Sequence, residues 1–342
     1  MTTSTLYPLR FEPILKPTIW GGNKISAYKG MGNAEEENIG ESWEISGVQG
    51  NVSVVSNGHL AGKTLNELID RYRELFVGEA VYQRFGNEFP LLIKFIDARE
   101  DLSIQVHPND EVARKQHQSN GKTEFWYIID AQEDASLYSG FNKKVTPEEV
   151  RQHVENNTIC SILNKESVQK NNAYFLPAGR VHSIGAGLFI AEIQQTSDAT
   201  YRLWDFDRID KNGNKRELHL DLALDAIDYR FYRQYKNAYK PCVGRPVKLQ
   251  ECSYFTTNLI EADTFIKFDY KRIDSFVIWI CLEGSAIFAS SKKHNQKIKQ
   301  GETIPIMGGS ALQNMGVINL MHEIVDLLPS PFDRRPVMAT NI

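Results

Sequence analysis

The chain has 342 residues, which is enough for one large domain or two of ordinary size. Its 42% hydrophobic and 24% charged residues are typical of a soluble globular protein. The net charge of −4 argues against broad nucleic-acid binding, because proteins that neutralise many phosphates are usually basic, although a small basic patch for one phosphate is compatible with it.

The sequence predicts neither a secretion signal nor a membrane segment. Its first residues, MTTSTLYPLRFEP, include no apolar run of signal-peptide length, and no stretch approaches the roughly 20 apolar residues of a membrane helix. Four cysteines lie far apart and form no CxxC motif: Cys160, Cys242, Cys252 and Cys281. We interpret them as structural thiols in a reducing compartment and expect a cytoplasmic protein.

Three segments have the pattern of helices. Residues 63–86 carry apolar side chains at helical spacing. Residues 146–163 begin with Thr-Pro-Glu-Glu, which provides an N-cap, a proline at the first helical position and acidic residues in the first turn. Residues 216–229 form the third segment, with a less regular pattern.

Most of the remaining chain predicts short strands. Apolar, β-branched or aromatic runs with turn residues at many of their ends include FPLLIKFIDA, TEFWYIIDA, NAYFLPAG, GLFIAEIQQ, YFTTNLIEA, FVIWICLEGSAIFA and ETIPIMGG. Such strands favour a sandwich or barrel, and helices that come in blocks disfavour a parallel doubly wound sheet. A Pro/Gly break at residues 239–245 predicts a domain boundary near residue 240, so we expect domains over 1–240 and 241–342.

Polar side chains mark the ends of three predicted strands. In DLSIQVHPND, Gln105 and His107 are two residues apart and so share one strand face. Lys122 and Glu124 share a face at the start of TEFWYII, and a buried glutamate is costly unless it is paired or binds a metal. His182 closely follows the turn Pro-Ala-Gly in FLPAGRVHSIGAG.

Together these positions predict a metal site. Two imidazoles, one carboxylate and one carboxamide can bind a metal ion and leave positions open for water or substrate. Three strands of a small barrel can point such side chains inward at one level. Spacing alone leaves the alternative, four unrelated residues near strand ends, about equally good.

The pattern resembles the metal motif of the cupins, which bind metal in a small β-barrel. Their first motif reads H-x-H, then Glu, then Gly, and their second reads P-x-G-x-x-H. Pro177, Gly179 and His182 match the second motif, and His107 and Glu124 match the first. Gln105 replaces the first histidine, and the gap from His107 to Glu124 is longer than usual.

Both departures resemble the type I mannose-6-phosphate isomerases in their shorter bacterial form. Segments in the family's order include YPLRFEPILKPTIWGG, GESWEIS, FPLLIKFIDA, LSIQVHP, GKTEFWYI, PAGRVHSI and TYRLWDFDR. The resemblance implies a mainly β fold of two cupin (jelly-roll) barrels, with a small helical portion attached to the N-terminal half. It implies a sugar-phosphate substrate and interconversion of mannose 6-phosphate and fructose 6-phosphate through an enediolate.

The resemblance also implies site residues. It implies a metal bound by Gln105, His107, Glu124 and His182, catalytic roles for Arg202 and Lys122, and phosphate contacts by Ser103 and Arg208. Glu192 is a further catalytic candidate because it lies among apolar residues in FIAEIQQ, and a paired core carboxylate is an equally good reading of it. The metal of the family is zinc, and we expect one Zn²⁺ per chain. A carboxamide oxygen is a harder ligand than zinc favours, so other divalent ions are compatible with the site.

Two roles stay open at this point. Glu192 and Lys122 are rival candidates for the base, whereas Arg202 stays protonated and suits charge stabilisation. Arg202 and Arg208 would be roughly 20 Å apart on a straight strand, so the chain must bend near residues 205–207 if both bind one sugar phosphate. A surface arginine paired with a neighbouring aspartate is an equally good reading of Arg208.

Two other functions fit a cupin fold, and one half of the chain is expected to bind no metal. An oxygenase would need a redox-active metal and would give Lys122 and Arg202 no evident task. A sugar-phosphate sensor would bind without turnover. His294 and His322, in the C-terminal part, have neither cupin motif around them, so we expect no metal there.

Overall fold

Strands dominate the computed structural model, which describes residues 6–31, 38–210, 212–270, 273–290, 295–306 and 315–318. The larger sheet has six antiparallel strands in the order β1 (Ile14–Gly22), β2 (Ile39–Ile45), β3 (Leu91–Ala98), β10 (Leu188–Gln195), β5 (Glu124–Ala131) and β8 (Ala173–Leu176). Its central strands β3 and β10 are buried along their whole length, as the apolar runs of the sequence predict.

A second sheet has five strands and packs on the first. Its order is β11 (Tyr201–Trp204), β4 (Ile104–Val106), β9 (His182–Ile184), β6 (Ser136–Phe141) and β7 (Leu163–Ser167). Leu137 and Ile184 of this sheet share a core cluster with Trp126 and Ile190 of the larger sheet. The strands of these sheets confirm the mainly β prediction. Within the described residues the strand pairings leave both sheets open, so two closed barrels stay a prediction.

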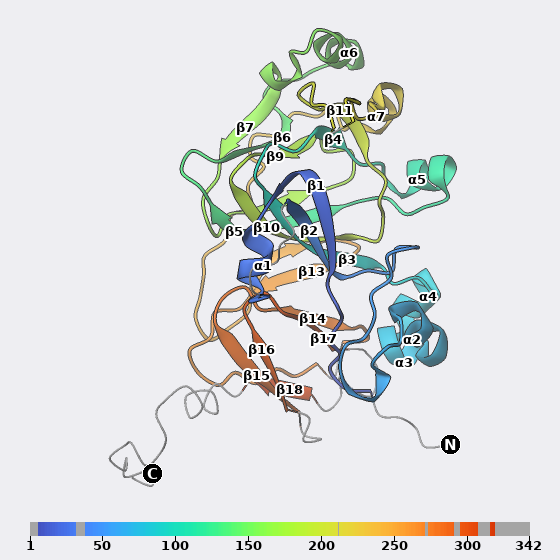
Figure 1. The fold of residues 1–342 in the computed structure, drawn as a ribbon, viewed down its shortest axis with the longest axis vertical. Coiled ribbons are helices and arrows are strands. Elements are labelled where there is room, and N and C mark those ends of the chain that lie inside the picture. Colours follow the sequence, from blue (N-terminus) through green and yellow to red (C-terminus); the bar gives the residue numbers. More distant parts are fainter. Residues whose placement is uncertain are drawn as a thin grey trace.

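Helices cover the outer faces of the two sheets (Figure 1). The predicted helix over 63–86 is three short ones, α2 (Leu65–Tyr72), α3 (Glu74–Val77) and α4 (Glu79–Phe85). Arg73 and Gly78 separate them with positive φ of 49° and 96°, values that interrupt a right-handed helix.

The other two helix predictions are confirmed over shorter spans. The segment 146–163 gives α6 (Pro147–Glu155) and the 3₁₀ turn η2 (Ile159–Ser161), and α6 begins with the expected cap at Thr146. The segment 216–229 gives α7 (Leu220–Ala226). The remaining helical elements are α1 (Lys24–Tyr28), η1 (Gly58–Leu60) and α5 (Asp110–His117). No helix of the described residues is long and apolar enough to cross a membrane.

The C-terminal strands form three small sheets. They are β12 (Val247–Glu251) with β13 (Thr256–Leu259), β14 (Val277–Ile280) with β17 (Thr303–Ile306), and β15 (Ser285–Ser290) between β16 (Asn295–Lys299) and β18 (Met315–Ile318). The start of the chain is hydrogen-bonded to them: Leu9 N–H donates to the Pro305 carbonyl at 3.2 Å, and the Gln296 amide donates to the Pro8 carbonyl at 2.7 Å. These contacts cross the predicted boundary at residue 240, which stays a prediction. His294 and His322 lie outside the described residues.

Candidate metal centre and active site

Strands from both sheets bring the predicted metal ligands together. Gln105 on β4 pairs directly with His182 on β9, and His107 follows the end of β4. Glu124 begins β5 in the opposite sheet. The side chains of His107, Glu124 and His182 are at most 2% exposed, and their ligand atoms lie within 4.8 Å of one another. These three residues form a group that can hold a metal ion.

Two backbone carbonyls orient the imidazoles. His107 Nδ1 lies 2.9 Å from the Ala199 carbonyl, and His182 Nδ1 lies 2.8 Å from the Arg180 carbonyl. If each Nδ1 donates its proton there, each Nε2 is left as an acceptor. These Nε2 atoms lie 3.2 Å and 3.5 Å from the Glu124 carboxylate.

The donor atoms of the group fit a cation. His107 Nε2 and Glu124 Oε2 are buried and have no hydrogen-bond donor among the described residues. Such buried, unsatisfied atoms are costly unless an ion or water binds them. The Gln105 amide is placed with Nε2 3.3 Å from His182 Nε2, while Oε1 accepts from Ser103 Oγ at 3.1 Å. Exchange of the amide oxygen and nitrogen, which leaves the shape unchanged, turns the oxygen toward the group.

Burial sets the charges of the centre. It lowers the pKa of His107 to about 3 and also lowers the pKa of His182, so both are neutral at ordinary pH, as metal ligands must be. Burial acts to raise the pKa of Glu124, but that pKa is held well below the usual range, and with both imidazoles neutral the adjacent cation is Lys122. Lys122 Nζ lies 3.2 Å from Glu124 Oε1.

Glu192 belongs to a buried charge network beside the metal ligands. On β10 it lies opposite Lys94 of β3 and Trp126 of β5. Its Oε2 accepts from Trp126 Nε1 at 2.7 Å, and its Oε1 lies 3.5 Å from Lys94 Nζ, which also lies 3.5 Å from Glu41. Burial, and next the charge of Glu124, raise the pKa of Glu192 to about 7. Sequence reasoning missed Lys94 and Glu41; a lysine inside the apolar run FPLLIKFIDA was the available signal.

Arg202 and Ser103 connect to the metal ligands by hydrogen bonds. Arg202 on β11 pairs directly with Gln105 on β4. Its Nε donates to Ser103 Oγ at 3.3 Å, and Ser103 Oγ lies 3.1 Å from the Gln105 amide, within hydrogen-bond distance of it. The three side chains therefore lie next to one another.

The chain makes a tight turn at residues 205–208, as the proposed role of Arg208 needs. Phe206 and Asp207 have φ of 56° and 57°, and Arg208 N–H donates to the Asp205 carbonyl at 3.1 Å, which closes a tight turn. The turn brings Arg208 back so that its Nη1 donates to the carbonyl of Asp101, two residues before Ser103. A paired arginine, the alternative reading, also describes it, because Nη2 donates to the Asp205 carboxylate at 2.6 Å.

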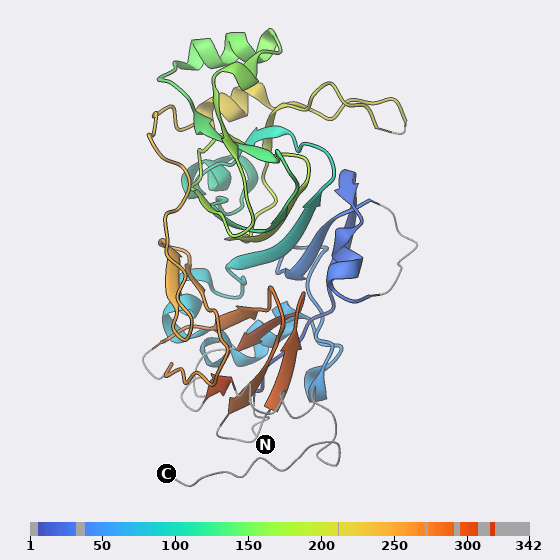
Figure 2. The ribbon, with the colours of Figure 1, turned by 90° about the vertical axis from the view of Figure 1, so that its left-hand side faces the viewer.

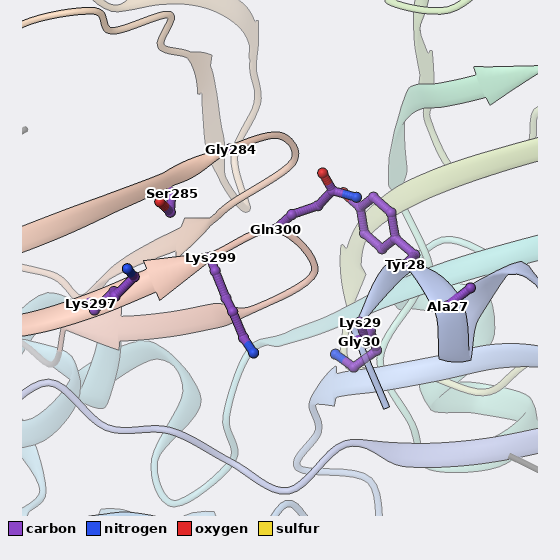
Figure 3. Close-up of a pocket in the computed structure, with 9 residues that line it drawn as sticks. All are labelled: Ala27, Tyr28, Lys29, Gly30, Gly284, Ser285, Lys297, Lys299 and Gln300. Carbon is purple, nitrogen blue, oxygen red and sulfur yellow. The ribbon is translucent and has the colours of Figure 1, made fainter. Parts of the chain in front are cut away.

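A hollow of about 330 Å³ lies between residues of the N-terminal and C-terminal parts (Figure 3). It is bounded by α1 and by the strands β15 and β16, where Tyr28, Lys29 and Lys299 line it. None of the predicted site residues lines it, so it belongs to the seam between the N-terminal and C-terminal parts.

The chain is similar to known isomerases. The family model described as phosphomannose isomerase type I, catalytic domain, matches residues 9–133. The chain is 39% identical over 255 residues to the mannose-6-phosphate isomerase ManA of Bacillus subtilis, covering 74% of this chain and 78% of the relative. It is 36% identical over 264 residues to the mannose-6-phosphate isomerase of Streptococcus mutans, covering 77% and 78%.

Solved structures agree with the sequence comparison. The crystal structure of the mannose 6-phosphate isomerase from Bacillus subtilis superposes with a TM-score of 0.82 at 31% identity, covering 92% of this chain and 97% of that one. A variant of the phosphomannose isomerase from Salmonella typhimurium superposes with a TM-score of 0.73 at 15% identity, covering 92% and 97%, which shows the shared fold alone.

Proposed function

This chain belongs to the type I mannose-6-phosphate isomerase family, and from that premise we propose that it interconverts mannose 6-phosphate and fructose 6-phosphate through an enediolate. One observation carries the proposal to chemistry: two neutral imidazoles and an ionised carboxylate converge in a buried group beside further titratable side chains. Aldose–ketose isomerisation needs a base near a carbon-bound proton and positive charge near the developing oxyanion.

We propose that Gln105, His107, Glu124 and His182 hold one Zn²⁺ per chain. The unsatisfied Nε2 of His107 and Oε2 of Glu124 support a cation at this position, and the family resemblance supports zinc. Bound there, the ion would polarise the sugar oxygens and stabilise the enediolate charge. We expect no metal in residues 241–342, so one metal equivalent per chain supports this assignment and two contradict it.

We propose Glu192 as the base that moves the proton between the two carbons. With its pKa raised to about 7, it exchanges a proton near neutral pH, as an efficient base must. Lys122, the rival, already pairs through its Nζ with Glu124 Oε1 at 3.2 Å. Near-normal turnover of Glu192→Gln together with complete loss in Lys122→Ala would reverse this choice.

We assign three residues to the negative charges of the substrate, which are those of the enediolate and of the phosphate: Arg202, Ser103 and Arg208. Arg202 stays protonated, and its hydrogen bond through Ser103 to Gln105 supports a role in stabilising the enediolate. Ser103 and Arg208 are the proposed phosphate contacts, and the turn at residues 205–208 supports the placement of Arg208.

We also propose the finer fold and location. The shared core of the two facing sheets supports a cupin-type jelly roll over residues 1–240, and the separate small sheets after it support a second β domain over 241–342. The four free cysteines support a cytoplasmic location.

The deciding experiment is a coupled assay of mannose 6-phosphate conversion on protein stripped with a chelator and then re-supplied with Zn²⁺. Loss and recovery of activity are expected. Tight metal binding without isomerisation under any divalent ion would overturn the proposal. Dioxygen consumption or binding of sugar phosphate without turnover would then identify an oxygenase or a sensor.

A further inference from the structure

A hairpin projects from the molecule after β11 (Figure 2). Ile209 and Lys215 form an antiparallel bridge, so Arg208 and Arg216 are the next facing pair. Like charges that face each other across a hairpin destabilise it unless an anion lies between them. Asp205 supplies one: its carboxylate accepts from Arg208 Nη2, and from Arg216 through both Nε, at 2.7 Å, and Nη2.

This cluster keeps an excess of positive charge. Arg208 and Arg216 both pair with a single carboxylate that is 5% exposed, that of Asp205, and Arg202 is near enough for its pKa to respond to the charges of Asp205, Arg208 and Arg216. The other nearby acids are peripheral. Half-exposed Glu100 lies 3.9 Å from Arg208, and Glu217, 84% exposed, gives Arg202 only its backbone carbonyl.

The positive charges act on one another. Burial, and next the charge of Arg216, lower the pKa of Arg202. Three cations around one buried anion leave about two positive charges without a buried partner, which suits a dianion.

Two arginine donors of this cluster are unused, and one of these two arginines, Arg202, is linked to a proposed metal ligand. Arg216 Nη1 and Arg202 Nη2 have no hydrogen-bond acceptor among the residues that the structure describes. Arg202 reaches the metal ligand Gln105 through one intervening side chain, that of Ser103. The cluster therefore adjoins the position proposed for the reacting end of the sugar.

We propose that Arg216 binds the phosphate group of the substrate and that Asp205 positions Arg208 and Arg216 for it; this inference rests on the proposed isomerase function. A sugar phosphate carries about −1.5 to −2 at neutral pH, which matches the excess charge of the cluster. The planar guanidinium presents paired donors with the geometry of phosphate oxygens. Arg216 thus makes the site selective for phosphorylated over unphosphorylated sugar.

The test separates phosphate binding from chemistry. Kinetics of zinc-loaded wild type and Arg216→Ala are compared on mannose 6-phosphate and on unphosphorylated mannose, with inhibition by inorganic phosphate measured in parallel. Loss of charge-assisted hydrogen bonds is expected to raise the KM for mannose 6-phosphate and the inhibition constant of phosphate about 10- to 100-fold. The kcat/KM for mannose is expected to change less than about twofold.

Two further variants keep the test decisive. Arg216→Gln retains a donor to Asp205 but no charge, so it stands in if the alanine variant does not fold. Arg230→Ala removes an arginine with the same two-pronged pairing, to Asp228, on an exposed surface, and it should match wild type. Asp205→Asn should raise the KM for mannose 6-phosphate more than it lowers kcat.

The outcomes distinguish this inference from the function it rests on. A wild type that does not convert mannose 6-phosphate contradicts the function. An active wild type with unchanged KM in folded Arg216→Ala and Arg216→Gln, or with equal losses on both sugars, contradicts the role of Arg216 alone.

Discussion

At the scale of single residues, the candidate metal centre depends on which nitrogen of each imidazole carries the proton. Backbone carbonyls favour Nδ1 in both rings. The carbonyls of Ala199 and Arg180 each have an imidazole Nδ1 within hydrogen-bond distance. Burial keeps both rings neutral, so neither His107 nor His182 must lose a proton when a cation binds at ordinary pH. The centre is therefore organised for metal before any metal arrives.

Replacement of His182 tests this organisation. His182→Ala should lose its stoichiometric metal and at least about 100-fold in activity, because removing even an outer partner of a ligand commonly costs 10- to 100-fold. Metal content by elemental analysis and the isomerase assay measure both effects. His153→Ala, on α6, is the matched control and should keep both. One tightly bound equivalent in His182→Ala would contradict the assignment.

The pKa of Glu192 predicts a pH dependence of stability in the metal-free protein. Its folded pKa, about 7, is above the ordinary 4.5, so between these values the folded state holds a proton that the unfolded state has lost. The contribution of Glu192 to the free energy of unfolding must then fall as pH rises through this range, by about 1.4 kcal/mol per pKa unit.

Urea unfolding of metal-free wild type and Glu192→Gln at pH 5 and pH 8 measures this contribution. Glutamine cannot ionise, so the variant should gain stability relative to wild type at the higher pH, by an amount on the order of 2–3 kcal/mol. A difference between the two proteins that stays constant with pH would exclude the raised pKa.

At the scale of elements, the turn before β9 is hydrogen-bonded to His107 and leads into His182, so it connects two of the proposed metal ligands. Gly179 N–H donates to the carbonyl of His107 at 2.9 Å, and the Gly179 carbonyl accepts from Asp228 N–H at 2.8 Å. The turn also leads directly to His182. Its glycine has φ of +89°, and a Cβ there would lie 2.9 Å from the carbonyl oxygen of Ala226.

Gly179→Ala should therefore destabilise the protein and weaken metal binding. The expected loss is about 1–3 kcal/mol, from a positive φ and a steric conflict together. Gly50→Ala is the control, because Gly50 has a φ of +79° but open space around its Cβ position. Denaturant unfolding and zinc titration measure the two effects. Equal losses in both variants would mean that the contact with Ala226 is unimportant.

Local patterns predicted the buried central strands, left others such as β2, β6 and β7 unnamed, and predicted the helices only in part. The apolar runs of β3, β5 and β10 are visible because both of their faces are buried. Helix α5 was missed because Ala113 is its only buried residue, so it has no apolar stripe to detect. The breaks within residues 63–86 were missed because Arg73 adopts a positive φ, which its residue type does not predict.

The candidate site, too, could be predicted from the sequence only in part. Residue types at strand ends made His107, Glu124 and His182 candidates, and the family resemblance was needed to favour them over unrelated residues. The pairing of Lys94 with Glu192 and of Arg216 with Asp205 depends on which strands meet in three dimensions. Sequence spacing alone could not supply that information.

At the scale of the whole molecule, a buried ion pair of the N-terminal part is hydrogen-bonded to the turn between β16 and β17. Lys29 Nζ lies 2.7 Å from Glu44 Oε2 and donates to the carbonyl of Gly301 at 2.8 Å. Ser42 Oγ donates to the other oxygen of Glu44 at 2.6 Å. Both charged side chains are under 10% exposed, so neither can turn to water if its partner is removed.

Lys29→Met should lower the free energy of unfolding by about 3–5 kcal/mol, because it leaves the Glu44 carboxyl buried without its partner. Lys63→Met, which removes the exposed pair with Glu67, should cost no more than about 0.5 kcal/mol. Urea titration of both variants gives the comparison. A cost below about 1 kcal/mol for Lys29→Met would mean that the pair does not hold the seam.

The hydrogen bonds of Pro8 and Leu9 to the C-terminal strands can form only late in translation, because their partners are synthesised long after them. A ribosome adds about 5–20 residues per second, so tens of seconds separate the emergence of Leu9 from that of Pro305. Once His182 has emerged, the growing chain has all of the proposed metal ligands but still lacks the strands that bond to its first segment. We expect truncated nascent chains to depend on chaperones more than the finished enzyme does.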